Sequence, residues 1–415
     1  MMNRYVGAVV LCLLVAGCQT FDKTLDSADR AISAIKSPTA KTVTDLAKAD
    51  DPQSVLREGL KRRADLYERD PRVLVGDLRG LRRDYDKLVS VLTGKVGKEW
   101  GKKETKLPSR TSYIKYTQNY QSRAIVDFDT GNITVETLDD KNPRASLKNA
   151  IVTTLLTPDD PRAVDLFSDK AVTLSSDKDP YLLGLVQDQR GKSITTPAQA
   201  ESYADFLIEK QSSSRKVEVK DGTRDALSVL FSMVANFQNK QAEKYREVVG
   251  RYAAQFKVSP SLVFAVIRTE SNFNPFAVSS APAYGMMQLV PSSGGRDAYR
   301  TVKGRDEMPT KEYLFDAQNN IELGAAYLGV LLYKQLDVVA NPTSREYCAI
   351  SAYNTGSANV LKTFAKDRVA AVNAINSLEP PGVYEKLRSG LPYEETRQYL
   401  VRVTDSRRQF LNFGK

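Results

Sequence analysis

The sequence predicts an α+β fold, in which a small mixed α+β domain precedes a mainly α-helical domain. Residues 122–137 alternate apolar and polar side chains around a glycine-containing turn, which indicates a β-hairpin. From Pro197 onward, apolar residues recur almost throughout at the spacing of helices. A chain of 415 residues is long enough for two or three domains with cores of their own.

The first residues are typical of an export signal. Arg4 is followed by an apolar run over residues 5–17, which is too short to span a bilayer comfortably. The run ends in Val-Ala-Gly-Cys, which resembles the lipobox of bacterial lipoproteins. The alternatives are a plain secretory signal, or a buried helix with a chance cysteine.

The lipobox resemblance implies that residues 1–17 are removed and that Cys18 is acylated, which would anchor the chain in the lipid bilayer. Gln19, rather than an aspartate, follows the cysteine. In the enterobacterial pattern this implies the outer membrane, with the protein facing the periplasm.

Residues 18–110 are expected to form a lipidated tether and a basic helical segment. The first part is polar and rich in Ala, Thr and Asp, as tethers are. Apolar residues then recur at helical spacing over residues 56–94, which predicts one or two helices with a break near Pro71. A basic loop that contains Trp100 is expected to follow.

Positive charge is concentrated in this segment. Residues 56–110 hold sixteen Lys/Arg against nine Asp/Glu, and the whole chain has a formal net charge of +10. A basic surface suggests an anionic partner. An exported lipoprotein does not meet nucleic acid, so lipid headgroups and peptidoglycan stem peptides are better candidates. A solvated helix face that binds neither is the alternative.

Residues 111–237 are expected to form the α+β domain, and residues 238–415 the helical domain. Besides the hairpin, helical spacing predicts a helix at 145–156, and short apolar runs predict strands at 170–176 and 181–188. Further amphipathic helices are predicted at 200–211, 225–240 and 242–256.

The sequence contains no histidine, which excludes Ser-His-Asp triads and His-ligated zinc. Of the three cysteines, Cys12 leaves with the signal and Cys18 carries lipid, so Cys348 remains alone and is expected to be a small core residue. Catalysis is therefore left to carboxylates, lysine or tyrosine.

Glu270 is the first candidate for chemistry. Ser259 and Pro260 form a good helix start, and Asn274 before a proline ends the helix. Glu270 continues the apolar face of this helix, which is made by Val263, Val266 and Ile267.

An unpaired buried carboxylate is costly, so Glu270 should either find a partner or be largely protonated. A protonated carboxylic acid is what general-acid catalysis needs. The alternative is a core glutamate paired with an arginine, although Arg268 is too close in sequence to face it.

Three further segments are notable. A turn-like segment contains Gly285, Met287 and Gln288, Asp316 is placed to cap a helix, and Tyr353-Asn354 precede a glycine where a helix could end. Each alone is equally compatible with ordinary loop or helix-end packing.

Together and in this order, these segments resemble the soluble-lytic-transglycosylase family, which has a goose-type-lysozyme-like fold. The family signature runs Glu-Ser, Gly-Leu-Met-Gln, Ala-Tyr-Asn and Arg-x-Tyr, and the four blocks begin here at Glu270, Gly285, Ala352 and Arg397. Met286 stands for the leucine and should be harmless. Thr355 replaces a small family residue.

The resemblance implies a peptidoglycan lytic transglycosylase. Such an enzyme cleaves the β-1,4 bond between N-acetylmuramic acid and N-acetylglucosamine without water, and gives 1,6-anhydromuramyl products. It implies Glu270 as the catalytic acid and base, with help from the muramyl N-acetyl group and with no metal or cofactor. The implied substrate-binding residues are Ser271, Met287, Gln288, Tyr353, Asn354 and Tyr399.

Residues 113–137 and 150–169 also resemble the domain that precedes the catalytic unit in one group of membrane-bound lytic transglycosylases. The basic insert across residues 24–95 is a departure from that group. Two rival functions are a muramidase and a non-catalytic lipoprotein that anchors murein. A muramidase needs to activate water, and Asp297 and Glu307 are open candidates for that role.

Overall fold

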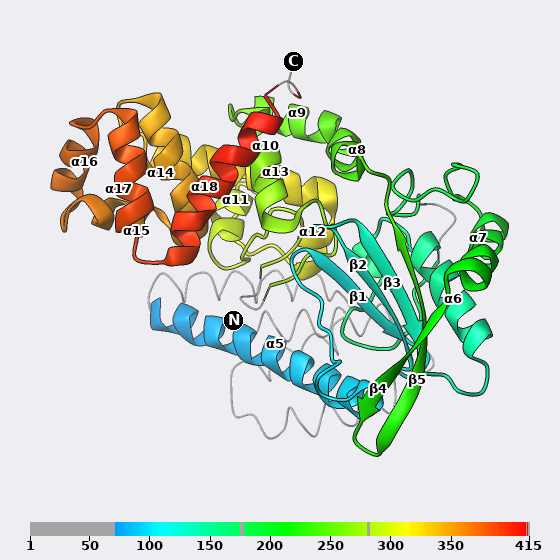
Figure 1. Cartoon of the computed structure of the whole chain (residues 1–415). Helices are drawn as coiled ribbons and strands as arrows, with labels where there is room; N and C mark the ends of the chain where they lie inside the picture. Colours follow the sequence, from blue (N-terminus) through cyan, green and yellow to red (C-terminus); the bar gives the residue numbers. More distant parts are fainter. Residues whose placement is uncertain (1–70, 175–177, 280–282, 412, 414–415) are drawn as a thin grey trace, which may run out of the picture. The chain divides into compact units, whose positions relative to one another are not determined.

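Figure 1 shows the computed structural model of the chain, which describes residues 71–174, 178–279, 283–411 and 413. The chain divides into two compact units, residues 1–86 and 87–415, and the second contains the sheet and the helical domain. The expected signal, the lipidated cysteine and the tether lie outside the described residues.

The first part of the second unit is built around a five-stranded antiparallel sheet with the strand order β1-β2-β3-β5-β4. The predicted hairpin is confirmed, because β2 pairs antiparallel with β3 and Gly131 makes the turn between them at a φ of +74°. The strands are β1 (Ser112–Thr117), β2 (Ser122–Asp127), β3 (Asn132–Thr137), β4 (Ser213–Val219) and β5 (Gly222–Ser232).

Two predicted helices pack against this sheet and against each other. They are α6 (Pro143–Leu156) and α7 (Pro197–Gln211), and both begin with a proline in the first turn. Thr196 and Gln199 form a capping box at the start of α7, which satisfies backbone N–H groups of its first turn. A short 3₁₀ helix, Pro161–Ala163, follows α6.

Two predictions for this part of the chain are wrong. Residues 170–174 are irregular, and residues 181–188 form turns with isolated bridges rather than a strand. The predicted helix over 225–240 is instead strand β5 followed by α8 (Phe237–Lys244). Side chains of β5 alternate between buried and exposed, and Leu230 points outward. A short apolar run is compatible with helix and strand alike, so periodicity alone does not decide.

Helix α5 (Pro71–Trp100) begins at the predicted break but extends into the first part of the predicted basic loop, as far as Trp100, and residues 101–110 are irregular as predicted. Leu92, Val96 and Trp100 are spaced four residues apart, share one face of the helix and are fully buried. The guanidinium carbon of Arg123 lies 3.8 Å from the centre of the Trp100 ring. Burial of this aromatic side chain against the sheet holds the last turn in helical form.

The rest of the described chain is helical, as predicted. The helix α10 packs against α9 and α18, α14 packs against α18 and α15, and α13 packs against α9 and α11. These helices are α9 (Arg246–Gln255), α10 (Pro260–Ser271), α11 (Gly294–Lys303), α12 (Lys311–Phe315), α13 (Ala317–Val330), α14 (Pro342–Thr355), α15 (Ser357–Phe364), α16 (Arg368–Asn376), α17 (Pro380–Gly390) and α18 (Glu394–Gln409). A π-helical turn, Leu331–Gln335, follows α13.

The predicted α+β fold class is thus confirmed. Within the described ranges, no helix is both long enough and apolar enough to cross a membrane.

The sheet domain and the helical domain meet at residues 272–278, directly after α10. The ring of Phe276 lies 5.0 Å from that of Tyr113 on β1. The side-chain amide of Asn272 donates to the backbone carbonyl of Phe128, at the end of β2. The segment after Glu270 is therefore held by the sheet domain as well as by its own helix.

Candidate active site

Glu270 lies in the last turn of α10, whose limits follow from the sequence. Pro260 occupies the first helical position, where its missing N–H costs no hydrogen bond. Ser259 precedes it, but its side chain makes no capping hydrogen bond. The helix ends at Ser271 because Asn272 adopts a left-handed conformation with a φ of +48°. Glu270 lies on the buried face, as its spacing predicted, and is 6% exposed.

Burial is the main influence on Glu270 and raises the pKa of its carboxyl to about 7. The Tyr399 hydroxyl and the guanidinium groups of Arg110 and Arg402 act in the opposite direction, whereas the Glu395 carboxylate adds to the rise. A carboxyl with this pKa can hold its proton near neutral pH and also release it there, as a general acid–base group must.

Arg110 is the cation in ion-pair contact with this carboxyl. Its Nη1 atom lies 3.6 Å from Glu270 Oε2 and 3.8 Å from Glu395 Oε1. The buried glutamate therefore does have an arginine partner, as the alternative interpretation of the sequence allowed. However, the Arg110 side chain is 34% exposed, and both distances exceed those of a hydrogen bond. A positive charge thus lies near the carboxyl, but no hydrogen bond joins the two groups.

The predicted Gly-Met-Met-Gln turn is fixed by a buried asparagine. Gly285 has a φ of +73°, and a Cβ atom there would lie 2.3 Å from the Leu314 carbonyl oxygen. Asn320 accepts a hydrogen bond from the Met287 N–H at 2.7 Å and donates to the carbonyls of Tyr284 and Leu314 at 2.9 and 2.7 Å. Only glycine fits between this asparagine and the turn.

Asn320 itself is positioned by a predicted cap. The Asp316 side chain accepts a hydrogen bond from the Asn319 N–H at 2.9 Å, which starts α13 and places Asn320 in its first turn. Asn320 was not predicted as a site residue, because nothing in its local pattern distinguishes it from other helical asparagines.

Ser271, Met287 and Tyr353 use their polar groups within the protein. The Ser271 hydroxyl donates to the Met286 carbonyl at 2.8 Å, which joins α10 to the turn. The Tyr353 hydroxyl donates to the Met287 carbonyl at 2.9 Å, which joins α14 to the same turn. Ser271 and Met287 are fully buried. These three residues therefore fix the turn relative to the two helices.

Gln288 and Tyr399 offer unpaired buried atoms. Gln288 Nε2 donates to the carbonyls of Ala277 and Gly285 at 3.1 and 2.9 Å, which fixes the orientation of the amide and leaves Oε1 without a partner among the described residues. The Tyr399 hydroxyl also has none there, although it lies close enough to Glu270 to lower the pKa of that carboxyl. Unpaired buried atoms are costly, which suggests that a ligand completes them.

Asn354 lies at the end of α14, and its Oδ1 accepts a hydrogen bond from the Thr396 hydroxyl at 2.6 Å. The helix ends at the following residue, and Gly356 adopts a φ of +85°, as the sequence predicted. Cys348, earlier in the same helix, is fully buried as predicted, and burial raises the pKa of its thiol to about 12. That thiol is a core group rather than a nucleophile.

The second carboxylate beside Glu270 is neither of the two that the sequence left open. Asp297 and Glu307 pair with arginines of their own segment, at 3.5 and 3.8 Å. Glu395, at the start of α18, instead shares an arginine with Glu270. No local pattern predicts this contact, because the partners are distant along the chain.

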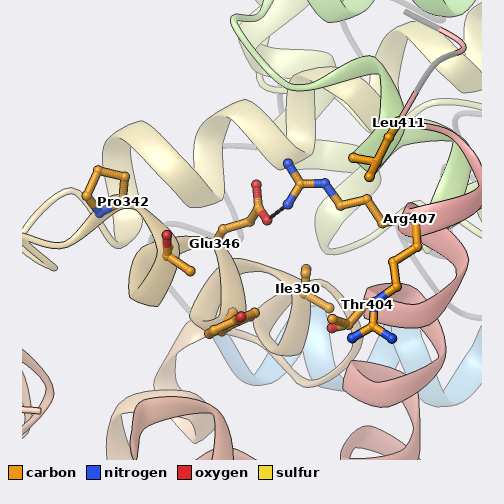
Figure 2. Close-up of a pocket in the computed structure, with 9 residues that line it drawn as sticks. Pro342, Glu346, Ile350, Thr404, Arg407 and Leu411 are labelled. Carbon is orange, nitrogen blue, oxygen red and sulfur yellow. Dashed lines mark hydrogen bonds and ion pairs between the residues drawn. The ribbon is translucent and has the colours of Figure 1, made fainter. Parts of the chain in front are cut away.

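A cavity of about 380 Å³ lies at the other end of the α14 and α18 pair (Figure 2). Glu346 and Arg407 point toward each other across it and form an ion pair. Its remaining lining residues come from the start of α14 and the end of α18, and the predicted site residues are not among them. Within the described residues, no group of three or more Cys, Asp and Glu side chains could hold a metal ion.

The closely related proteins share the name membrane-bound lytic murein transglycosylase C. The protein of Klebsiella pneumoniae subsp. pneumoniae is 40% identical over 326 residues, which cover 79% of this chain and 89% of the relative. That of Shigella sonnei is 39% identical over 327 residues, with the same coverage. That of Yersinia enterocolitica is 40% identical over 311 residues, which cover 75% of this chain and 85% of the relative.

Solved structures of soluble lytic transglycosylases are more distant. An inactive mutant of lytic transglycosylase Slt from Pseudomonas aeruginosa is 28% identical, with a TM-score of 0.32, and the match covers 41% of this chain and 25% of that one. The 70 kDa soluble lytic transglycosylase of Escherichia coli is 15% identical, with a TM-score of 0.32, and the match covers 95% and 55%.

Residues 247–376 match the family described as the transglycosylase SLT domain, so the chain is a peptidoglycan lytic transglycosylase. Residues 67–244 match the family described as the N-terminal domain of membrane-bound lytic murein transglycosylase C. The chain belongs to the membrane-bound lytic murein transglycosylase C family.

Proposed function

We propose that this enzyme cleaves the β-1,4 bond between N-acetylmuramic acid and N-acetylglucosamine without water, and releases 1,6-anhydromuramyl products. Such cleavage serves remodelling and turnover of the cell wall. The observation that carries the proposal is Glu270, a buried carboxyl with a pKa of about 7 that lies close to the Tyr399 hydroxyl. These are the properties of an acid that donates a proton and recovers one at the same place.

The reaction begins when Glu270 donates its proton to the glycosidic oxygen, and the bond from that oxygen to C1 of muramic acid breaks. The N-acetyl oxygen of the same sugar bonds to C1, so the substrate itself takes the place of a second carboxylate. The Glu270 carboxylate then takes the proton of the C6 hydroxyl, whose oxygen displaces the acetamide from C1. The acid is restored, and no water is consumed.

The unpaired atoms suit this chemistry. Gln288 Oε1 can accept the N–H of the muramyl acetamide, and the Tyr399 hydroxyl can donate to its developing charge. Tyr353 and Asn354 border the same site from α14. Ser271 and Met287 act through the turn that they hold. The reaction requires neither metal nor cofactor.

Hydrolysis of the same bond is the second candidate function, and Glu395 is the observation that favours it. A carboxylate near the acid can activate water in glycosidases. Its contact with Arg110 and its 65% exposure favour a charge-balancing role instead.

We further propose that the enzyme is an exported lipoprotein of the outer membrane that faces the periplasm. Residues 1–17 are the signal, Cys18 is the acylated residue, and residues 18–110 link the anchor to the domains at 111–237 and 238–415. The lipobox-like sequence and the membrane-bound description of the relatives support this proposal.

Mass spectrometry of products from purified sacculi tests the catalytic proposal. The wild-type chain should release 1,6-anhydromuramyl fragments, and Glu270→Gln should release them more slowly by about 10²-fold or more. A dominant product with reducing-end muramic acid would establish the muramidase instead. If the wild-type chain binds sacculi but releases no fragment, the non-catalytic anchor lipoprotein is the function that remains.

A further inference from the structure

We propose that Arg110, which lies outside the helical domain, is a positioning residue for the lytic reaction and sets the protonation of Glu270 from the sheet side of the molecule. This inference rests on the proposed function of Glu270. Arg110 lies in the segment between α5 and β1, before the region that carries the family's catalytic signature. Its Nη1 atom nevertheless lies 3.6 Å from Oε2 of the Glu270 carboxyl.

The backbone of Arg110 is held by the segment that follows Glu270. Asn274, which is fully buried, donates from Nδ2 to the Arg110 carbonyl oxygen at 3.0 Å. One residue earlier, the Ser109 carbonyl accepts a hydrogen bond from the Val278 N–H at 3.4 Å. The two segments are thus paired on both sides of Arg110, which keeps its side chain at the carboxyl.

Arg110 balances two carboxylates of unequal exposure. The Glu270 side chain is 7% exposed and that of Glu395 is 65% exposed, yet both lie within ion-pair distance of the same Nη1 atom. Solvent screens the charge of Glu395 more strongly than that of Glu270. The arginine therefore acts mainly on the buried acid, and Glu395 competes with that acid for it.

The groups that act on Glu270 come from three elements. Arg402, Glu395 and the Tyr399 hydroxyl belong to α18, the Tyr353 hydroxyl belongs to α14, and Arg110 precedes β1. Burial, and next the Glu270 charge, raise the pKa of both tyrosines well above their ordinary range, so both remain neutral during catalysis. Arg110, Arg402 and Glu395 therefore provide the fixed charges around the acid.

Opposite changes in this cluster should have opposite effects. The positive charge of Arg110 lowers the pKa of Glu270, so its removal lets the acid keep its proton to higher pH. The negative charge of Glu395 raises that pKa, so its removal makes the acid lose its proton at lower pH. General disruption of the site would lower activity in both variants but would not shift their pH profiles in opposite directions.

The experiment measures kcat/KM against pH for release of anhydromuramyl fragments from sacculi by the full chain in detergent. The first step needs protonated Glu270, so the alkaline limb of the profile reports its pKa in the free enzyme. Arg110→Met should move this limb up by about one pH unit, and Glu395→Gln should move it down. Arg110→Lys keeps the charge and should return the limb toward the wild-type position.

Two matched controls remove the same charges nearby. Lys106→Met changes an exposed cation of the Arg110 segment, and Glu394→Gln changes the exposed carboxylate next to Glu395. Both should leave the limb in place. If Arg110→Met and Glu395→Gln both fold, and the alkaline limb of their pH profiles stays at the wild-type position, the inference is overturned.

If Arg110→Met does not fold, Arg110→Gln makes the same test with a polar side chain at this partly exposed position, and an unmoved limb there overturns the inference. Full activity in Glu270→Gln would refute the proposed function itself. If Glu270→Gln is inactive but the pH profiles of Arg110→Met and Glu395→Gln are unshifted, only the role of Arg110 is refuted.

Discussion

The Tyr353 hydroxyl donates to the backbone carbonyl of Met287 at 2.9 Å and so joins the last turns of α14 to the Gly-Met-Met-Gln turn. Tyr399, on α18, is buried at least as deeply but has no hydrogen-bond partner among the described residues. Both tyrosines lie near Glu270, but only the Tyr353 hydroxyl joins two segments of the fold, and the proposed function assigns the Tyr399 hydroxyl to the substrate.

We expect Tyr353→Phe and Tyr399→Phe to separate stability from activity. Tyr353→Phe leaves the Met287 carbonyl unpaired and should lower the free energy of unfolding by about 1–2 kcal/mol. Tyr399→Phe removes an unpaired hydroxyl, so it should be neutral or stabilising, and it should lower kcat by roughly 10²-fold. Urea unfolding and product release measure the two effects. A strongly destabilised Tyr399→Phe would mean that this hydroxyl has a structural role.

Glu270→Gln should keep the fold and the binding of sacculi, because glutamine preserves the shape of the side chain. It should lower activity by about 10² or more, since the titrating proton is lost. Circular dichroism and sacculus pull-down are the controls for fold and binding. A glutamine variant as active as the wild type would move the catalytic acid elsewhere.

The same substitution should change how stability depends on pH. The carboxyl ordinarily ionises near 4.5 and in the folded protein near 7, so between these values the folded state binds more protons. Wild-type stability therefore falls as pH rises through this window and stays lower above it. The free energy of unfolding of Glu270→Gln minus that of the wild type should therefore be larger at pH 8 than at pH 4, by roughly 2–3 kcal/mol. Parallel stability curves for the two proteins would contradict this prediction.

Gly285→Ala should strongly destabilise the turn, because its Cβ would meet both the Leu314 carbonyl and the Asn320 amide, at 2.3 and 2.4 Å. Gly191→Ala is a matched control, because Gly191 has a similar φ of +75° with no atom near the added carbon. Gly191→Ala should lower the free energy of unfolding by about 1 kcal/mol, and Gly285→Ala should lower it several times more. Thermal unfolding measures both, and equal losses would show that the close approach to Asn320 is unimportant.

The anchor can be tested separately from the chemistry. Cys18→Ser should release the protein from the membrane fraction, because a short apolar signal does not itself span a bilayer. The variant should cleave solubilised murein fragments as the wild type does. A mutant that still sediments with outer membranes and resists extraction with salt would show that lipid on this cysteine is not the anchor.

The sequence was sufficient for features that local patterns encode. The hairpin around Gly131, the helix that presents Glu270 and the cap at Asp316 all depend on neighbouring residues, and all were predicted correctly. The helical spacing at residues 225–240 is misleading, because β5 is a strand, and Asp221-Gly222 before it is a hairpin turn signal that favours the strand.

The charges around the acid could not be predicted in the same way. Arg110 and Glu395 come from opposite ends of the second unit. The packing of the sheet domain on residues 272–278 brings Arg110 to the acid, whereas the packing of α18 on α10 brings Glu395. Neither residue belongs to a recognisable motif, so a single sequence holds no signal for the contact. Local patterns thus predicted the buried position of Glu270 but not the charged residues around it.

The docking of residues 272–278 has a consequence for excision of the catalytic region. A fragment cut at residue 238 would contain every block of the family signature, yet Phe276 would lose the ring of Tyr113, and the amides of Asn272 and Asn274 would lose their acceptors. These groups immediately follow the acid, so the damage would fall on the active site rather than on a remote surface. The smallest piece of this chain that can cut murein normally is therefore larger than the piece that carries the signature.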